Sequence, residues 1–136
     1  MKKIIASVFV AFIAVFAAPW AHANDFTDLR TELSAARESL VTMMVNKDKR
    51  GADQQKLVKD TANAVSAHLA KLKAPAGKEA QFNELLENWN AFKKTRETEL
   101  VPAILAGKDD EAKKIAGGIQ KERITKCQQL VGELGG

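Results

Sequence analysis

Hydrophobic residues recur every three or four positions along most of the chain after residue 25. That spacing is typical of helices with one buried face. It is clearest in the first such segment, whose apolar stripe consists of Phe26, Leu29, Leu33, Ala36, Leu40 and Met43. No run of alternating β-branched residues indicates a strand. The pattern therefore predicts an all-α protein.

Glycine and proline divide the periodic sequence, because they cluster in short stretches at 49–51, 74–77 and 106–108. Four helices are predicted between these breaks: Phe26 to Lys49, Ala52 to Lys73, Lys78 to Leu105 and Asp109 to Leu134. Since the connections are short, neighbouring helices must run antiparallel. The expected architecture is an up-down-up-down antiparallel four-helix bundle.

Two positions should disturb this regular arrangement. Pro102 lies inside the third predicted helix and lacks the N–H that would bond to Thr98, so we expect a kink there. The pair Gly117-Gly118 should loosen the fourth helix or let a neighbour approach closely.

The N-terminus has the pattern of a secretory signal peptide. Two lysines are followed by an apolar run over 4–18 and by the small-residue site Ala21-His22-Ala23. The run is shorter than the roughly 20 apolar residues of a membrane span. We expect residues 1–23 to be removed and residues 24–136 to form one periplasmic domain; an uncleaved N-terminal anchor is the alternative.

The charge and the cysteine content narrow the range of possible functions. Without the signal, 19 basic and 17 acidic residues remain, interleaved along the chain, so no basic footprint for nucleic acid is expected. Cys127 is the single cysteine, which excludes an intrachain disulfide. We expect it to be a buried apolar residue; a handle for an intermolecular bond is the alternative.

The chain lacks the residue patterns of common enzymes. It has no Cys/His cluster for zinc, no glycine-rich phosphate loop and no nucleophile elbow, and only His68 remains after signal removal. The acids Asp109-Asp110-Glu111 fit the positive end of a helix. We therefore expect no enzyme, no metal site and no cofactor.

A haem-binding or electron-transfer bundle of the cytochrome type is the main cofactor alternative. Its ligands would be Met43 or Met44 with His68. Counted from the loop between their helices, these residues differ in height by roughly 18 Å at ~1.5 Å per residue, too far for one iron. His68 also lies at the edge of its stripe, where partial exposure is expected. A chaperone-like structural partner that uses helix surfaces is a further alternative.

Arginines occur where the helical period calls for apolar residues. Arg96 falls on the buried stripe after Trp89, Arg123 lies in line with Cys127, and Arg37 flanks the first stripe. All three reach a similar height, as does Thr61, so we expect them to hold a small anionic organic ligand between the helices. The alternative is that they extend to solvent between helices or pair with internal acids. Those acids are Glu38, Glu97 and Glu122.

A second layer brings Trp89, His68, Cys127 and Thr31 to similar heights. Core packing accounts for Trp89 and Cys127. The alternative is a second part of the binding site, in which the indole of Trp89 and the imidazole of His68 meet a planar or cationic ligand.

The segment 87–93, with Trp89 and Phe92, and the segment 100–112, with its Ala106-Gly107 turn, resemble a known family. They are similar to the second hairpin of the four-helix-bundle sensor domain of methyl-accepting chemotaxis receptors. That family carries W-x-x-F/Y on its third helix and an A-G–charged–E-A loop before its fourth. Because this chain ends at Gly135-Gly136, the resemblance implies a free-standing periplasmic version. It also implies a ligand carrier or a partner of a membrane receptor, and a homodimer with Cys127 near the seam.

Overall fold

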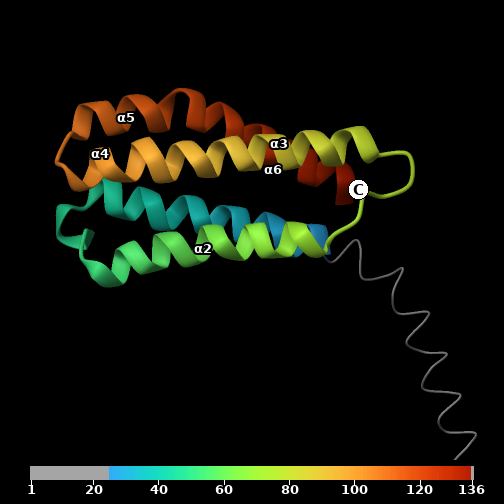
Figure 1. Ribbon diagram of the computed structural model, residues 1–136, viewed down its shortest axis with the longest axis horizontal. Coiled ribbons are helices and arrows are strands. Elements are labelled where there is room, and N and C mark those ends of the chain that lie inside the picture. The colour runs from blue at the N-terminus through green and yellow to red at the C-terminus, as the bar shows by residue number, and fades with distance from the viewer. Residues whose placement is uncertain (1–24, 136) are drawn as a thin grey trace, which may run out of the picture.

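The structure is a computed structural model that describes residues 25–135. Four helical rods in this part of the chain lie side by side as an antiparallel bundle (Figure 1). The first and third connections lie at one end and the second at the other. The predicted all-α, up-down-up-down bundle is confirmed, while the signal-peptide prediction falls outside the described residues.

The first rod is helical over residues 25–45 and is followed by the 3-10 turn η1 (Lys47–Lys49). The second rod is α2 (Ala52–Lys71). The third consists of α3 (Glu79–Thr95), the π-helical turn η2 (Arg96–Leu100) and α4 (Val101–Leu105). The fourth consists of α5 (Asp109–Gly117) and α6 (Ile119–Gly135).

The irregularity expected at Pro102 takes the form of the π turn η2. The N–H of Val101 bonds to the carbonyl of Arg96, five residues back rather than four. This turn ends just before Pro102, where a regular helix would lose a backbone hydrogen bond in any case. Arg96 therefore stands at the first position of a widened turn.

The fourth rod is interrupted at Gly118, as the glycine pair predicts. A Cβ on Gly118 would lie 2.9 Å from the carbonyl oxygen of Lys114, too close for any side chain without a backbone shift. The helix is broken at this residue: α5 ends at Gly117 and α6 begins at Ile119.

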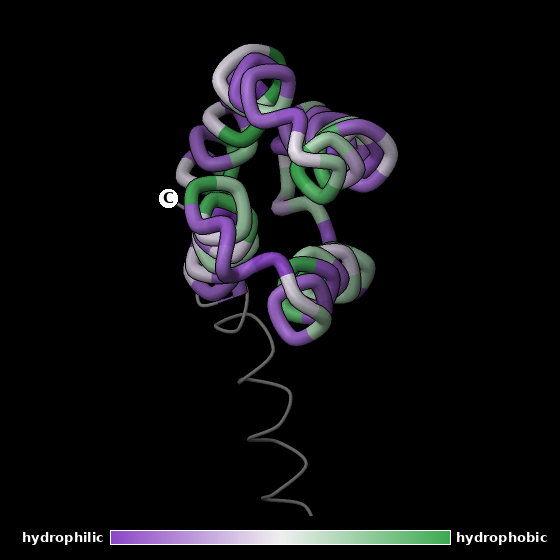
Figure 2. Tube along the Cα trace, turned by 90° about the vertical axis from the view of Figure 1, so that its left-hand side faces the viewer, coloured by the Kyte–Doolittle hydropathy of each residue, from purple (hydrophilic) through white to green (hydrophobic). Residues whose placement is uncertain are grey.

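The core fills the space between the rods, which Figure 2 shows around a common interior. Every member of the predicted stripe on the first helix is buried. The core divides into two clusters along the bundle. The larger contains Ala36 and Ala62, and the smaller contains Val58 and Leu100. The level between them is therefore where the packing of apolar side chains is interrupted.

Cys127 lies in the larger cluster and is fully buried. Burial raises the pKa of its thiol to about 12, so the thiol stays protonated and unreactive at neutral pH. Its predicted role as a small apolar core residue is confirmed. A disulfide across a dimer seam does not fit this position, because the sulfur has no access to another chain.

Arg50 closes the end of the bundle that carries the first and third connections. Its guanidinium donates to the carbonyls of Met43 at 2.9 Å, Met44 at 2.7 Å and Ile104 at 3.1 Å. It also pairs with the carboxylate of Asp109 at 3.1 Å, and this hydrogen bond lowers the pKa of Asp109. Arg50 thus satisfies carbonyls at two helix C-termini and joins them to the start of α5.

Across residues 25–135, none of the helices combines the length and the hydropathy that a bilayer crossing requires.

Candidate functional site: a groove floored by Arg96

Arg96 occupies the level between the two core clusters. Its side chain is among the largest buried groups, with 1% exposure, and its guanidinium donates from Nη1 to Ala36 O at 2.8 Å and from Nη2 to Val58 O at 2.6 Å. The side chain therefore connects η2 to both helices of the first hairpin. This confirms that Arg96 points inward, as its position on the apolar stripe predicts.

The charge of Arg96 has no carboxylate partner in residues 25–135. The neighbouring acid, Glu97, is exposed and accepts from Lys93 Nζ at 2.7 Å instead. Burial lowers the pKa of Arg96 to about 10, and the charge of Glu97 opposes that shift only partly. A buried cation without a carboxylate in contact is costly, so this arrangement calls for an explanation.

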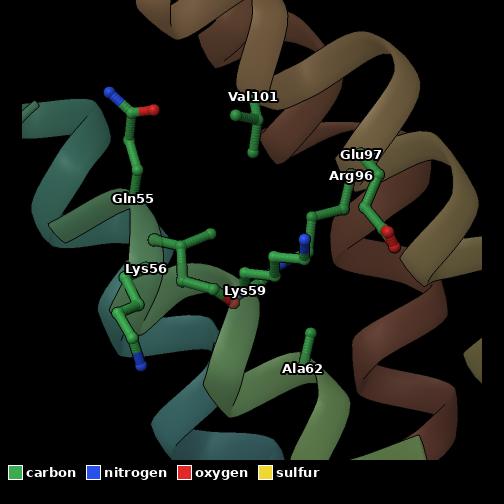
Figure 3. A pocket seen from close by; sticks show the side chains of 8 residues that line it. Gln55, Lys56, Lys59, Ala62, Arg96, Glu97 and Val101 are labelled. Atoms are coloured by element: carbon green, nitrogen blue, oxygen red, sulfur yellow. Dashed lines mark hydrogen bonds between the residues drawn. The ribbon is translucent and has the colours of Figure 1, made fainter. Parts of the chain in front are cut away.

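Arg96 forms the floor of an open groove of about 470 Å³ between α2 and the η2–α4 segment. We call this the Arg96 groove. In Figure 3 the arginine extends from the third rod across to α2, with Val101 on one side and Ala62 on the other. The residues that line the Arg96 groove are Gln55, Lys56, Val58, Lys59, Ala62, Arg96, Glu97 and Val101.

Positive charge predominates around the Arg96 groove. Lys56 and Lys59 are contributed by α2, and Glu97 is the single acid among the lining residues. Lys56 is paired with Asp60 at 2.5 Å, whereas Lys59 takes part in no ion pair within the described residues. The walls beside Arg96 are the apolar side chains of Val58, Ala62 and Val101. This combination suits an organic anion with an apolar part.

The structure does not bring the three predicted guanidiniums together, which corrects the expectation of one shared layer. Arg37 is exposed and lines a different groove. Arg123 is half-buried, and its Nη1 donates to Thr95 Oγ1 at 2.8 Å and to Gln120 Oε1 at 3.1 Å, so it joins α6 to α3. The alternative of pairing with internal acids is not seen for these arginines among residues 25–135.

Thr61 lies behind Arg96 rather than beside a ligand. Its hydroxyl lies 2.8 Å from Leu57 O, 3.1 Å from Val58 O, the same carbonyl that accepts from Arg96 Nη2, and 2.9 Å from the hydroxyl of Ser39. Thr61 therefore packs next to the carbonyl that holds the arginine and is not one of the residues lining the Arg96 groove.

Trp89 and His68 also lie apart. Trp89 is buried, donates from Nε1 to Ser66 Oγ at 2.9 Å and packs against Phe92 with ring centroids 5.5 Å apart. His68 is partly exposed, as predicted, and its Nδ1 is hydrogen-bonded to the carboxylate of Glu32. Trp89 is thus a core residue, as core packing predicts, and the alternative of a pocket shared with His68 is not formed.

His68 does not form a metal centre with its acidic neighbours. Glu32 contacts Nδ1, whereas Asp25 lies 3.8 Å from Nε2, so the two carboxylates flank different nitrogens of the ring. From residue 25 to residue 135, no group of three or more His, Cys, Asp or Glu side chains could hold a metal ion.

No protein-family model, curated protein or solved structure matches the chain.

Proposed function

We propose that this chain is a periplasmic, non-enzymatic binding or sensory module that holds a small organic anion in the Arg96 groove. One observation carries the proposal: Arg96 is buried without a carboxylate partner in the described chain, yet it lines an open groove. An anion in the groove would supply the counter-charge that the protein itself does not.

The chemistry of the groove defines the ligand class. A guanidinium binds a carboxylate through charge-assisted hydrogen bonds, which are shorter and stronger than neutral ones. Lys59 adds a second positive charge that is free of any ion pair in residues 25–135, while Val58 and Val101 offer apolar contact. A carboxylate attached to a small aliphatic or aromatic group meets all of these features.

The cellular role is part of the same proposal. The secretory pattern at the N-terminus supports a periplasmic location. The resemblance to chemotaxis-receptor sensor domains supports a sensory role, in which the loaded module would be recognised by a membrane receptor or would pair as a homodimer.

The proposal is tested by calorimetry with benzoate and succinate, and by native mass spectrometry of protein purified from the periplasm for copurified anions. Arg96→Met should weaken carboxylate binding by about 10- to 100-fold, the value of one charged hydrogen-bonding group. Lys59→Gln should weaken it by a few-fold, whereas Lys73→Gln, an exposed lysine outside the groove, should not.

Two results would refute the proposal. One is the absence of any carboxylate, copurified or added, on the wild-type protein. The other is binding by Arg96→Met that equals wild-type binding, since the ligand would then lie elsewhere.

A further inference from the structure

A second groove, of about 330 Å³, lies between the first helix and the fourth rod. We call it the Gly117 groove, after the last residue of α5, which lines it. Most of its walls are apolar side chains, from Leu40, Val41, Met44, Phe92 and Ile124. It shares no lining residue with the Arg96 groove.

The charged residues that line the Gly117 groove are all cations: Arg37, Lys113 and Lys121. The two lysines come from α5 and α6, and Arg37 comes from the first helix. Within residues 25–135 none of the three takes part in an ion pair, and no acid lines this groove. The Arg96 groove differs, because Glu97 lines it. The Gly117 groove is therefore apolar inside and positively charged at its rim.

Both polar side-chain atoms of Gln120, the one buried polar residue lining the groove, already take part in hydrogen bonds within the protein. Gln120 is 2% exposed, its Nε2 donates to Phe92 O at 2.9 Å, and its Oε1 accepts from Arg123 Nη1 at 3.1 Å. An occupant must therefore place apolar atoms inside and keep its own charge at the rim.

Gly117 lines the groove, and there is free space next to it. A Cβ built on this glycine would meet no atom within 4 Å, so a side chain could occupy that space without a clash. The neighbouring break at Gly118 ends α5 beside the same space.

We propose that the Gly117 groove binds a single-chain amphiphilic carboxylate, such as a medium-chain fatty acid. Its alkyl chain lies among the apolar walls, and its carboxylate lies against Lys113, Lys121 and Arg37. Charge complementarity supports this occupant, since the rim holds three unpaired cations and no acid.

Calorimetry with decanoate, below its micelle-forming concentration, tests the proposal on the chain without its predicted signal. Decanoate should bind one to one. Decyltrimethylammonium has the same alkyl chain and the opposite charge, and it should bind at least about tenfold more weakly because the rim repels it.

Matched variants locate the site. Lys113→Gln/Lys121→Gln should weaken decanoate binding by about tenfold, which corresponds to two exposed charge contacts. The control Lys73→Gln/Lys94→Gln removes two exposed lysines outside both grooves and should change binding by less than about twofold. Gly117→Leu should abolish binding by filling the space next to this residue. Circular dichroism would verify that each variant is folded.

Four outcomes would overturn the inference. The first two are no binding of decanoate to the wild-type protein, and binding of decyltrimethylammonium as tight as that of decanoate. The others are wild-type affinity for decanoate in the Lys113→Gln/Lys121→Gln variant, and binding of the protein to phosphatidylglycerol vesicles but not to free decanoate. Loss of decanoate binding in Arg96→Met, with full binding in the double lysine variant, would assign decanoate to the Arg96 groove. That result would refute the second site and leave the proposed function in place.

Discussion

Replacing Arg96 by methionine tests whether the buried guanidinium holds the fold together or is present for binding. The substitution removes two charged hydrogen bonds, to Ala36 O and Val58 O. Both carbonyls lie within helices and keep their backbone N–H partners. The hydroxyl of Ser39 also lies 2.9 Å from Ala36 O. No buried acceptor is therefore left without a partner.

The two opposing contributions are similar in size. Hydrogen bonds from a charged donor contribute about 1.5–3 kcal/mol each to stability. Against this, burial lowers the pKa of Arg96 from 12.5 to about 10. At about 1.4 kcal/mol per pKa unit, this shift of about 2.5 disfavours the charged form by roughly 3.5 kcal/mol. We expect the free energy of unfolding of Arg96→Met to fall by no more than about 3 kcal/mol, and apolar replacements of buried charges are often neutral.

Urea denaturation, followed by the fluorescence of Trp89 and by circular dichroism, measures this change. Leu100→Ala provides the internal reference, because Leu100 is a fully buried residue of the same π turn. Truncation of a buried leucine to alanine costs about 2–5 kcal/mol. If Arg96→Met loses more stability than Leu100→Ala, the arginine is a structural element, and the argument that its charge is kept for a ligand fails.

Three further predictions concern Arg50, Asp109 and Cys127. Arg50→Ala should lower the free energy of unfolding by about 2–4 kcal/mol, measured in urea, because helix-end carbonyls lose a charged donor. Hydrogen bonding to Arg50 lowers the pKa of Asp109, so its stabilisation is complete above the ordinary value of 3.8 and is lost as the pH falls through the lowered value. The difference in melting temperature between wild type and Asp109→Asn should therefore shrink on acidification below about pH 4; a constant difference would contradict this. Cys127 should react with a thiol reagent at pH 8 only after denaturant is added, and rapid labelling of the native protein would show that the thiol is accessible.

The bundle itself could be predicted from the sequence, because burial of one helix face imposes a period that the residues reveal. The first stripe, from Phe26 to Met43, is an example. The positions of the irregularities were predictable too, since proline and glycine have fixed backbone consequences. The form of the irregularity near Pro102 was not predictable, because a π turn before Pro102 and a kink at Pro102 can both accommodate the missing hydrogen bond.

The candidate site was only partly predictable. Arg96 lies in the middle of a stripe, so its direction follows from the helical period. Arg37 flanks the first stripe, and a long side chain there can turn either way. Arg123 lies in line with Cys127, but its guanidinium donates to Thr95 and Gln120 instead of reaching Arg96. Counting residues gives height along a rod, but it does not give the side of the bundle that a flanking residue faces. The role of Arg50 at the helix ends could not be predicted, because Arg50 lies in a connection, where no helical period indicates which way a side chain points.

The break at Gly118 separates a short piece of the fourth rod from the rest. α5 has nine residues and one fully buried side chain, Ala112. Isolated helices shorter than about 12–15 residues are marginal in water, so α5 depends on its neighbours for its stability. It can therefore open locally while the larger core cluster stays packed. Its amide hydrogens should exchange with solvent before those of α3 and α6, and limited proteolysis should first cut the chain in this segment.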